Sequence, residues 1–69
     1  MMFTAHIGLG ANLGDPVRTL DAAIQELRHL PDSQLTGLSH FYRSAPVGPA
    51  GQPDYVNAVV RLHTRLSPL

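Results

Sequence analysis

The sequence predicts an α+β fold in which one helix covers one face of an antiparallel sheet. An alternating strand pattern opens the chain, an amphipathic helix pattern follows it, and two strand-like stretches come after the proline that ends the helix. The order β-α-β-β is most of a ferredoxin-like sandwich. Ser67-Pro68-Leu69 has the form of a helix start, so we expect the chain to be truncated before the second helix and the fourth strand.

The first strand and the helix have the clearest patterns. Residues of alternating character from Phe3 to Leu9 predict a half-buried strand. Asp15 can cap a helix and proline suits the first helical turn, so we expect the helix to begin at Pro16. Leu30-Pro31 should close the helix, because a residue before proline is disfavoured in the α conformation. Its apolar stripe consists of Val17, Leu20, Ala23, Ile24 and Leu27.

The two later strands differ in how well the pattern defines them. From Leu35 to Arg43 we expect a strand, but its alternation is poor and its register stays open. The stretch from Asp54 to Arg65 alternates strongly and predicts a long strand that lies between the other two. One face of it carries Val56, Ala58, Val60 and Leu62. Tyr55 and Asn57 should therefore point to the opposite face, away from the helix.

Composition limits the size and the partners of the protein. A chain of 69 residues without cysteine can form one small domain, residues 1–69, with neither a disulfide nor a Cys-based zinc site. Arginines and acidic residues balance without a run of either sign, which argues against a surface for nucleic acid or for a membrane. No apolar run approaches the ~20 residues of a membrane span, so we expect a cytoplasmic protein. The uncovered part of the sheet, its face or its edge, predicts self-association.

Two familiar kinds of site lack the required spacing. Gly8, Gly10 and Gly14 suggest a phosphate-binding turn between strand and helix, with an ordinary strand-to-helix turn as the alternative. Leu13 stands where the dinucleotide fingerprint needs its third glycine, and the chain has no lysine for a P-loop. The histidines lie on different elements and the acidic residues are scattered, so the sequence predicts no metal site.

The stretch from Ser44 to Asn57 is the best candidate for a functional site. It is rich in proline and glycine and is longer than a turn between two strands needs to be, and such loops often carry binding groups. Tyr55 offers a flat aromatic surface, and Asn57 offers a hydrogen-bond donor and an acceptor. Together they can recognise a planar heterocycle. The alternative is a polar sheet face that binds no ligand.

Three blocks of sequence carry a family resemblance. They are GANLGD at residues 10–15, FYRSAPVG at residues 41–48 and QPDYVNAV at residues 52–59. In order and spacing they resemble the start of 6-hydroxymethyl-7,8-dihydropterin pyrophosphokinase, also called 2-amino-4-hydroxy-6-hydroxymethyldihydropteridine diphosphokinase. The likeness covers the whole chain but less than half of a usual member. For the full-length family it implies a ferredoxin-like fold and transfer of pyrophosphate from ATP to the pterin, with Mg²⁺, in folate biosynthesis.

The resemblance also implies roles for individual residues. Tyr55 would stack on the pterin ring, and Asn57 would form hydrogen bonds with its edge. The residues that would line the pocket, largely through backbone groups, are Ser44, Ala45 and Val47. A loop near the site would contain Gly10, Asn12 and Gly14. We expect no catalytic residue and no metal ligand in this chain, because the family's ligands for ATP and Mg²⁺ lie beyond the position of Leu69.

We therefore expect the chain to supply the pterin-binding half of a pyrophosphokinase, which is a diphosphotransferase, and to be catalytically inactive by itself. Two alternatives stay open. One is a non-catalytic module for pterin binding or for assembly with a second chain. The other is a small structural α+β domain without a ligand, which buried Tyr55 and Asn57 side chains would favour.

Overall fold

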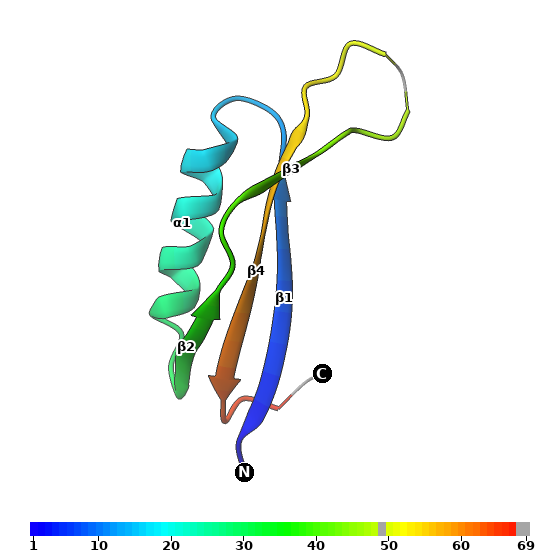
Figure 1. Cartoon of the computed structure of the whole chain (residues 1–69). Helices are drawn as coiled ribbons and strands as arrows, with labels where there is room; N and C mark the ends of the chain where they lie inside the picture. Colours follow the sequence, from blue (N-terminus) through cyan, green and yellow to red (C-terminus); the bar gives the residue numbers. More distant parts are fainter. Residues whose placement is uncertain (49, 68–69) are drawn as a thin grey trace.

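The computed structural model describes residues 1–48 and 50–67, and within them it contains one helix and four strands. The elements are β1 (Phe3–Ala11), α1 (Pro16–Arg28), β2 (Ser33–Leu38), β3 (Tyr42–Ser44) and β4 (Tyr55–Thr64). The long strand β4 lies in the middle of the antiparallel sheet, with β1 on one side and with β2 and then β3 on the other (Figure 1). These features confirm the predicted α+β fold and the central position of the last strand.

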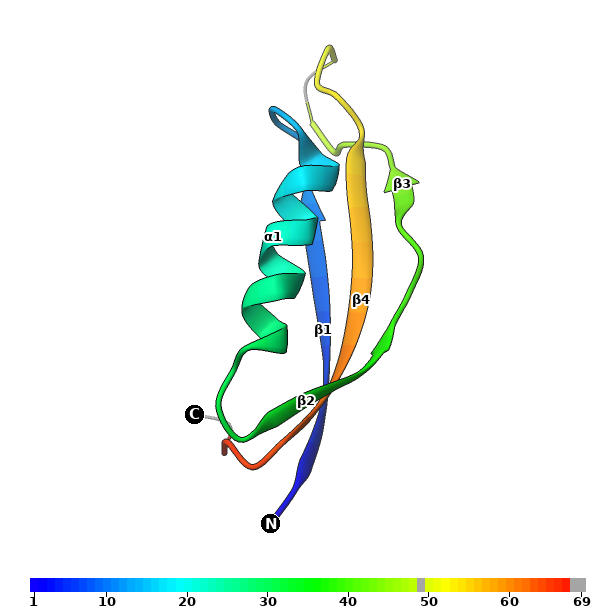
Figure 2. The same cartoon turned by 90° about the vertical axis from the view of Figure 1, so that its left-hand side faces the viewer.

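The helix covers one face of the sheet, where it runs along β1 and β4 (Figure 2). Its buried residues Leu20 and Ile24 come from the predicted apolar stripe. Leu20 packs with Val56 and Ala58 of β4, and the partly buried residues around this cluster are Leu9, Ala11 and Phe41. Burial of each such large side chain contributes about 1.5–3 kcal/mol. The core is therefore one layer thick, between the helix and the sheet.

The helix begins where the sequence predicts but ends earlier. The Asp15 carboxylate accepts a hydrogen bond of 3.2 Å from the Arg18 backbone N–H, which satisfies a free donor of the first turn. The helix α1 ends at Arg28, shortly before Leu30-Pro31, where the sequence predicts that the helix is closed. The backbone N–H groups of His29 and Leu30 bond to the carbonyls three residues earlier, so the chain tightens into a last 3₁₀-type turn.

The first strand and the last strand are close to their predicted extents. β1 continues to Ala11, beyond the predicted end at Leu9, because Ala11 still pairs with Val56 of β4. The helix start predicted at Ser67 includes Pro68 and Leu69, which lie outside the described residues. No helix in residues 1–48 and 50–67 has the length and the apolar character needed to cross a membrane.

The single strand predicted from Leu35 to Arg43 is wrong, because two strands occupy this region. Within β2 the pairing shifts at Thr36: Leu35 pairs with Leu62, and Gly37 pairs with Arg61. This bulge leaves Thr36 without an opposite residue and places Leu35 and Leu38 on the same face of the sheet. The bulge explains why the alternation in the sequence is poor.

The Arg61 side chain closes this bulge from β4. Its Nε donates to the Thr36 hydroxyl at 3.1 Å, and its Nη2 donates to the Thr36 carbonyl at 2.9 Å. The guanidinium lies directly over Gly37, where a Cβ atom would stand only 3.1 Å from Nη2. Glycine at this position therefore makes room for the bonds that hold the bulge.

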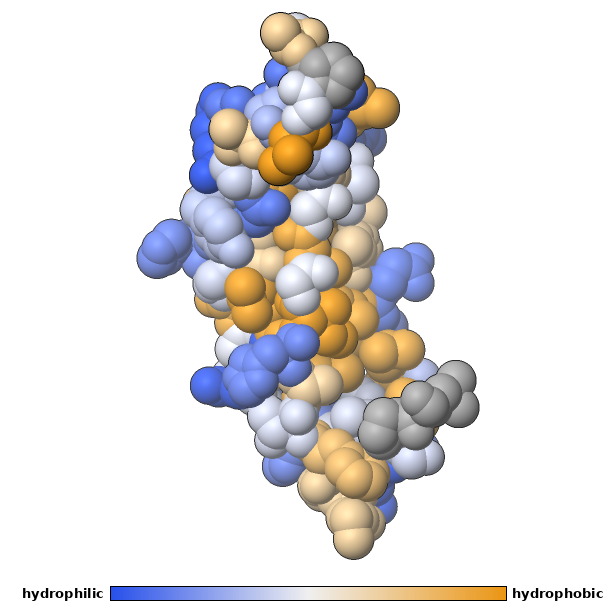
Figure 3. Space-filling view, turned by 90° about the vertical axis from the view of Figure 1, so that its right-hand side faces the viewer, coloured by the Kyte–Doolittle hydropathy of each residue, from blue (hydrophilic) through white to orange (hydrophobic). Residues whose placement is uncertain are grey.

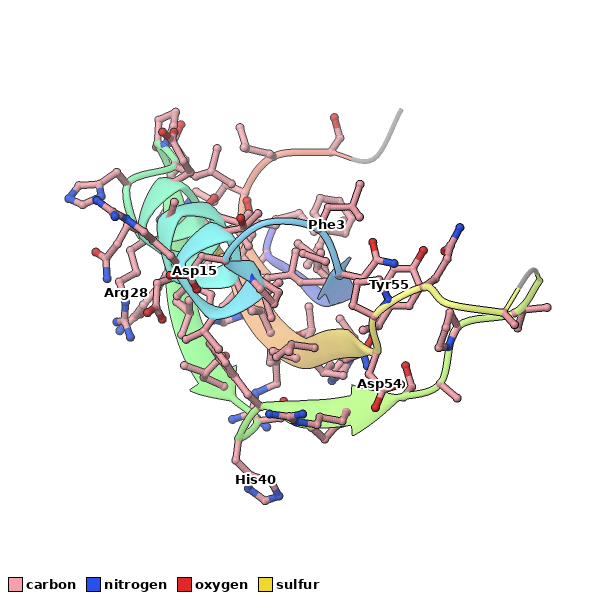
Figure 4. The ribbon with its side chains drawn as sticks, turned by 90° about the horizontal axis from the view of Figure 1, so that it is seen from above. Phe3, Asp15, Arg28, His40, Asp54 and Tyr55 are labelled. Carbon is pink, nitrogen blue, oxygen red and sulfur yellow. The ribbon has the colours of Figure 1, made fainter. Side chains whose placement is uncertain are left out.

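Between β2 and β3 the chain leaves the sheet, and Ser39 forms the hydrogen bonds to β4 at this point. Its backbone N–H donates to the Val59 carbonyl at 2.9 Å, and its hydroxyl accepts from the Val59 N–H at 2.8 Å. A side-chain oxygen thus replaces a strand carbonyl. The following residue His40 points away from the molecule (Figure 4), whereas Phe41 packs against the core.

Candidate functional site

The face of the sheet opposite the helix carries Tyr55 and Asn57. Their neighbours Val56 and Ala58 pack against Leu20 of the helix, so the alternate residues of β4 point the other way. Figure 4 shows Tyr55 on the opposite side of the sheet from Asp15 and Arg28 of the helix region. The predicted direction of both side chains is confirmed. We call this surface the open face.

Neither of these side chains is buried. Tyr55 is 36% exposed, and Asn57 is half-buried. Burial under other side chains would have favoured a small structural domain without a ligand, and the structure does not show such burial. A polar sheet face that binds no ligand stays open as the alternative.

Strand β3 brings two more side chains to the open face beside β4. Tyr42 pairs with Asn57, and Ser44 pairs with Tyr55, and residues directly opposite each other in a sheet project to the same side. Ser44 belongs to the site residues expected from the resemblance, but Tyr42 does not. No pattern in the sequence indicates Tyr42, because the break before β3 interrupts the alternation that would have assigned its face.

Asn57 is held in a defined orientation by β3. Its Nδ2 donates to the Tyr42 carbonyl at 3.2 Å and to the Ser44 hydroxyl at 2.8 Å. A carbonyl can only accept a hydrogen bond, so the amide nitrogen must face Tyr42 and the oxygen Oδ1 must face away from it. Within the described part of the chain, no group donates to Oδ1. Asn57 therefore presents an acceptor at the open face.

On the other side of Asn57 lies Gly10 of β1. The two residues pair directly, and a Cβ atom at Gly10 would stand 3.1 Å from Asn57 Oδ1 and 3.8 Å from Tyr55 Cδ1. Gly10 was expected in a loop near the site, but it lies within the strand and contacts the site from there. The next residue on this face, Gly8, pairs with Val59 and has open space above it.

The turn between β1 and α1 meets the end of the long loop. Asn12 Nδ2 donates to the Pro53 carbonyl at 3.4 Å, and Gly14 adopts a φ of 68°, a conformation that favours glycine. A cavity of about 310 Å³ lies between these segments. It is lined by Asn12, Leu13, Gly14, Pro16, Arg43, Pro53, Asp54 and Val56. Since Arg43 pairs with Val56, this cavity is on the helix side, and neither Tyr55 nor Asn57 lines it.

The loop from β3 to β4 projects beyond the end of the sheet (Figure 1). Ala45 is exposed, and Val47 is fully exposed. In this structure neither side chain joins the group formed by Tyr42, Ser44 and Asn57. In residues 1–48 and 50–67, no three His, Cys, Asp or Glu side chains come together as metal ligands.

Comparison with known proteins identifies related sequences. A family model described as 7,8-dihydro-6-hydroxymethylpterin-pyrophosphokinase (HPPK) matches residues 6–69. The chain is 52% identical over 68 residues to 2-amino-4-hydroxy-6-hydroxymethyldihydropteridine pyrophosphokinase of Haemophilus influenzae, a match that covers 99% of this chain and 42% of the relative. It is 41% identical over 69 residues to the protein of the same name from Pseudomonas aeruginosa, covering 100% of this chain and 43% of that relative. The chain thus spans less than half the length of both relatives.

Proposed function

The chain belongs to the 7,8-dihydro-6-hydroxymethylpterin-pyrophosphokinase family, and we propose that it supplies the pterin-binding part of such an enzyme of folate biosynthesis. In this proposal the complete enzyme is a diphosphotransferase that transfers pyrophosphate from ATP to the hydroxymethyl group of the pterin. Residues 1–69 form the amino-terminal part of its single domain. The observation that carries the proposal is the Asn57 carboxamide, which β3 fixes at the open face and whose Oδ1 accepts no hydrogen bond from residues 1–48 and 50–67.

The open face fits a flat, polar heterocycle. Tyr55 provides a ring for stacking, and Asn57 Oδ1 accepts a hydrogen bond from an N–H on the edge of the pterin. Ser44 contributes by holding Asn57, and we propose that Ala45 and Val47 approach the pterin when it is bound.

These contacts predict weak binding by the chain alone. Stacking on one aromatic ring contributes about 0.5–1.5 kcal/mol beyond area burial, and one neutral hydrogen bond contributes about the same. A dissociation constant of about 1 mM already requires about 4 kcal/mol. These two contacts supply about 1–3 kcal/mol before the buried area is added, so the described residues account for a dissociation constant no tighter than the millimolar range. Tighter binding needs a second wall of the pocket.

We propose that ATP and Mg²⁺ are used by the complete enzyme but are not held by the described residues. When bound, the metal ions would neutralise charge on the transferred group. The proposal places the residues that hold ATP and Mg²⁺ in the remaining part of the complete enzyme. We expect the 69-residue chain to lack transfer activity.

A titration followed by nuclear magnetic resonance tests the binding proposal, because this method detects millimolar affinity. Adding 6-hydroxymethyl-7,8-dihydropterin should shift the side-chain amide signals of Asn57 and the backbone signal of Tyr55. Asn57→Ala should remove the response. His63→Ala is the matched control, since His63 lies on the same face of β4 about 20 Å away and its loss should leave binding unchanged. Shifts confined to the cavity around Asn12 and Leu13 would contradict the proposal.

A transfer assay separates an enzyme part from a binding module. The chain alone should form no pyrophosphorylated pterin from ATP. Adding a second polypeptide that covers the remaining part of the Haemophilus influenzae relative should restore transfer if the chain is part of the enzyme. A non-catalytic binding module would bind the pterin but would gain no activity from this addition.

We further propose a cytoplasmic location and self-association of the isolated chain. Apolar groups remain on its surface, as Figure 3 shows for one side of the molecule. The large exposed apolar side chains include Met2, Leu13, Val17, Leu38, Val47 and Leu66. Analytical ultracentrifugation over a range of concentrations tests this part. A single monomeric species at every concentration would contradict it.

A further inference from the structure

The strand β1 carries two glycines on the open face that differ in their surroundings. Gly8 and Gly10 pair with Val59 and Asn57 of β4, so both project to the side opposite the helix. A Cβ atom added at Gly8 meets nothing within 4 Å. A Cβ atom added at Gly10 stands 3.1 Å from Asn57 Oδ1. Only Gly10 therefore controls the space available to the Asn57 carboxamide.

We infer that Gly10 is a positioning residue for pterin recognition: the missing side chain lets the Asn57 carboxamide lie against β1 with Oδ1 directed at the ligand. This inference rests on the proposed function of the open face. It assigns Gly10 a role within a strand, through Asn57, and no direct contact with the pterin.

The Asn57 carboxamide has little freedom to move. A Cβ atom at 3.1 Å from Oδ1 requires a shift of a few tenths of an ångström, and Oδ1 can move only if the whole amide group turns. Its nitrogen is already bonded to the Ser44 hydroxyl and, at 3.2 Å, to the Tyr42 carbonyl. Turning the amide changes the geometry of both bonds, and the bond to Tyr42 is already at the upper end of the usual range for N–H···O bonds.

The effect should stay local to Asn57. The Tyr55 ring would be 3.8 Å from the new Cβ atom, which is ordinary van der Waals contact, so the stacking surface keeps its place. The backbone pairing of β1 with β4 needs no change, and alanine is no worse than glycine in a strand. Gly10→Ala should therefore impair the hydrogen bond to the pterin without unfolding the sheet.

The test compares Gly10→Ala with Gly8→Ala in the 69-residue chain. Without ligand, Gly10→Ala should shift the Asn57 side-chain amide signals, and Gly8→Ala should leave them unchanged. In the pterin titration Gly10→Ala should bind about fivefold more weakly than the wild-type chain, which corresponds to one lost neutral hydrogen bond of about 1 kcal/mol. Gly8→Ala should bind as tightly as the wild-type chain.

A comparison in the Asn57→Ala variant shows whether any poor folding of Gly10→Ala results from crowding of Asn57. In Asn57→Ala the atom that Gly10→Ala would crowd is absent, so the added methyl group should change neither the melting temperature nor the spectrum of the sheet. If the wild-type chain binds the pterin and Gly10→Ala binds equally well with unchanged Asn57 signals, the inference is wrong and the proposed function stands. If the wild-type chain does not bind the pterin, both the inference about Gly10 and the proposed function are wrong.

Discussion

Replacing Ser44 by alanine shows how much the site depends on the bond that orients Asn57. The Ser44 hydroxyl accepts a hydrogen bond of 2.8 Å from Asn57 Nδ2, while the bond from the same nitrogen to the Tyr42 carbonyl is 3.2 Å. Ser44→Ala removes the shorter bond. The backbone pairing of Ser44 with Tyr55 does not involve the side chain and should persist. The expected result is a folded chain with a less constrained carboxamide.

The magnitude follows from this single bond. A neutral hydrogen bond contributes about 0.5–1.5 kcal/mol net to stability. Ser44 is exposed and water can replace the lost partner, so the free energy of unfolding should fall by about 0.5 kcal/mol, the lower end of that range. The pterin must then select the orientation of the carboxamide itself. Its affinity should fall by about two- to tenfold, because the ordering of a side chain opposes binding by up to about 1.5 kcal/mol.

A double-mutant cycle measures this coupling. Urea unfolding is carried out on the wild-type chain, Ser44→Ala, Asn57→Ala and the double variant, and the pterin titration on the wild-type chain and Ser44→Ala. In the Asn57→Ala background, which should not bind the pterin, the loss of the Ser44 hydroxyl should leave the free energy of unfolding unchanged. Equal effects of Ser44→Ala in both backgrounds would refute the reasoning, since the hydroxyl would then act independently of Asn57.

Two further substitutions test the core and the bulge. Leu20→Ala should destabilise the chain by about 2–5 kcal/mol, comparable to the whole ~3–10 kcal/mol expected for this length, because Leu20 is 2% exposed and packs against Val56. For Leu20→Ala, circular dichroism should show that most of the helix signal is lost. The control is Val17→Ala, which should stay folded because the Val17 side chain is exposed. A folded Leu20→Ala variant would contradict the assigned core. Gly37→Ala should displace the Arg61 guanidinium and lower the midpoint of urea unfolding. In the Arg61→Ala variant, Gly37→Ala should not lower the midpoint of urea unfolding, because the crowded guanidinium is absent. An equally lowered midpoint in that variant would show that Gly37→Ala acts through the backbone and not through Arg61.

The elements that the sequence predicts well are those whose pattern reflects one buried face. In β4 the residues Val56, Ala58 and Val60 are buried because they face the helix, and the residues between them are accessible. In α1 the predicted stripe supplies the buried Leu20 and Ile24. Local chemistry fixes the start of the helix, where Asp15 needs only the backbone three residues ahead.

The parts that the sequence does not predict depend on partners far along the chain. The bulge at Thr36 is closed by Arg61, which is 25 residues away. The break after β2 is stabilised by Ser39 through the backbone of Val59, which is 20 residues away. Local sequence patterns do not predict these hydrogen bonds, because no residue close in sequence to Thr36 or Ser39 indicates its distant partner. The end of α1 is a smaller case, since proline excludes helix at Leu30 but does not exclude an earlier end.

For the site, the residue types of Tyr55 and Asn57 and the family resemblance direct attention to β4, but they do not reveal Tyr42, and they place Gly10 in a nearby loop and not beside Asn57. Both take part because of strand register. Gly10 pairs with Asn57 from β1, and Tyr42 pairs with Asn57 from β3. The sequence places these residues in separate blocks. Only the pairing shows that the Asn57 side chain of β4 is held by β3 and lies beside Gly10 of β1.

The register of β3 itself results from the break that interrupts the predicted strand. Leu38 pairs with Val60 and Tyr42 pairs with Asn57, so four steps along one strand match three steps along the other. Without this extra residue, Tyr42 would stand opposite Val56 and its side chain would point to the helix. Ser44 would follow it to that side and could not reach Asn57. The irregularity that defeats the alternation pattern is therefore the feature that brings Ser44 and the Tyr42 carbonyl to the Asn57 amide, and that leaves Oδ1 free for a ligand.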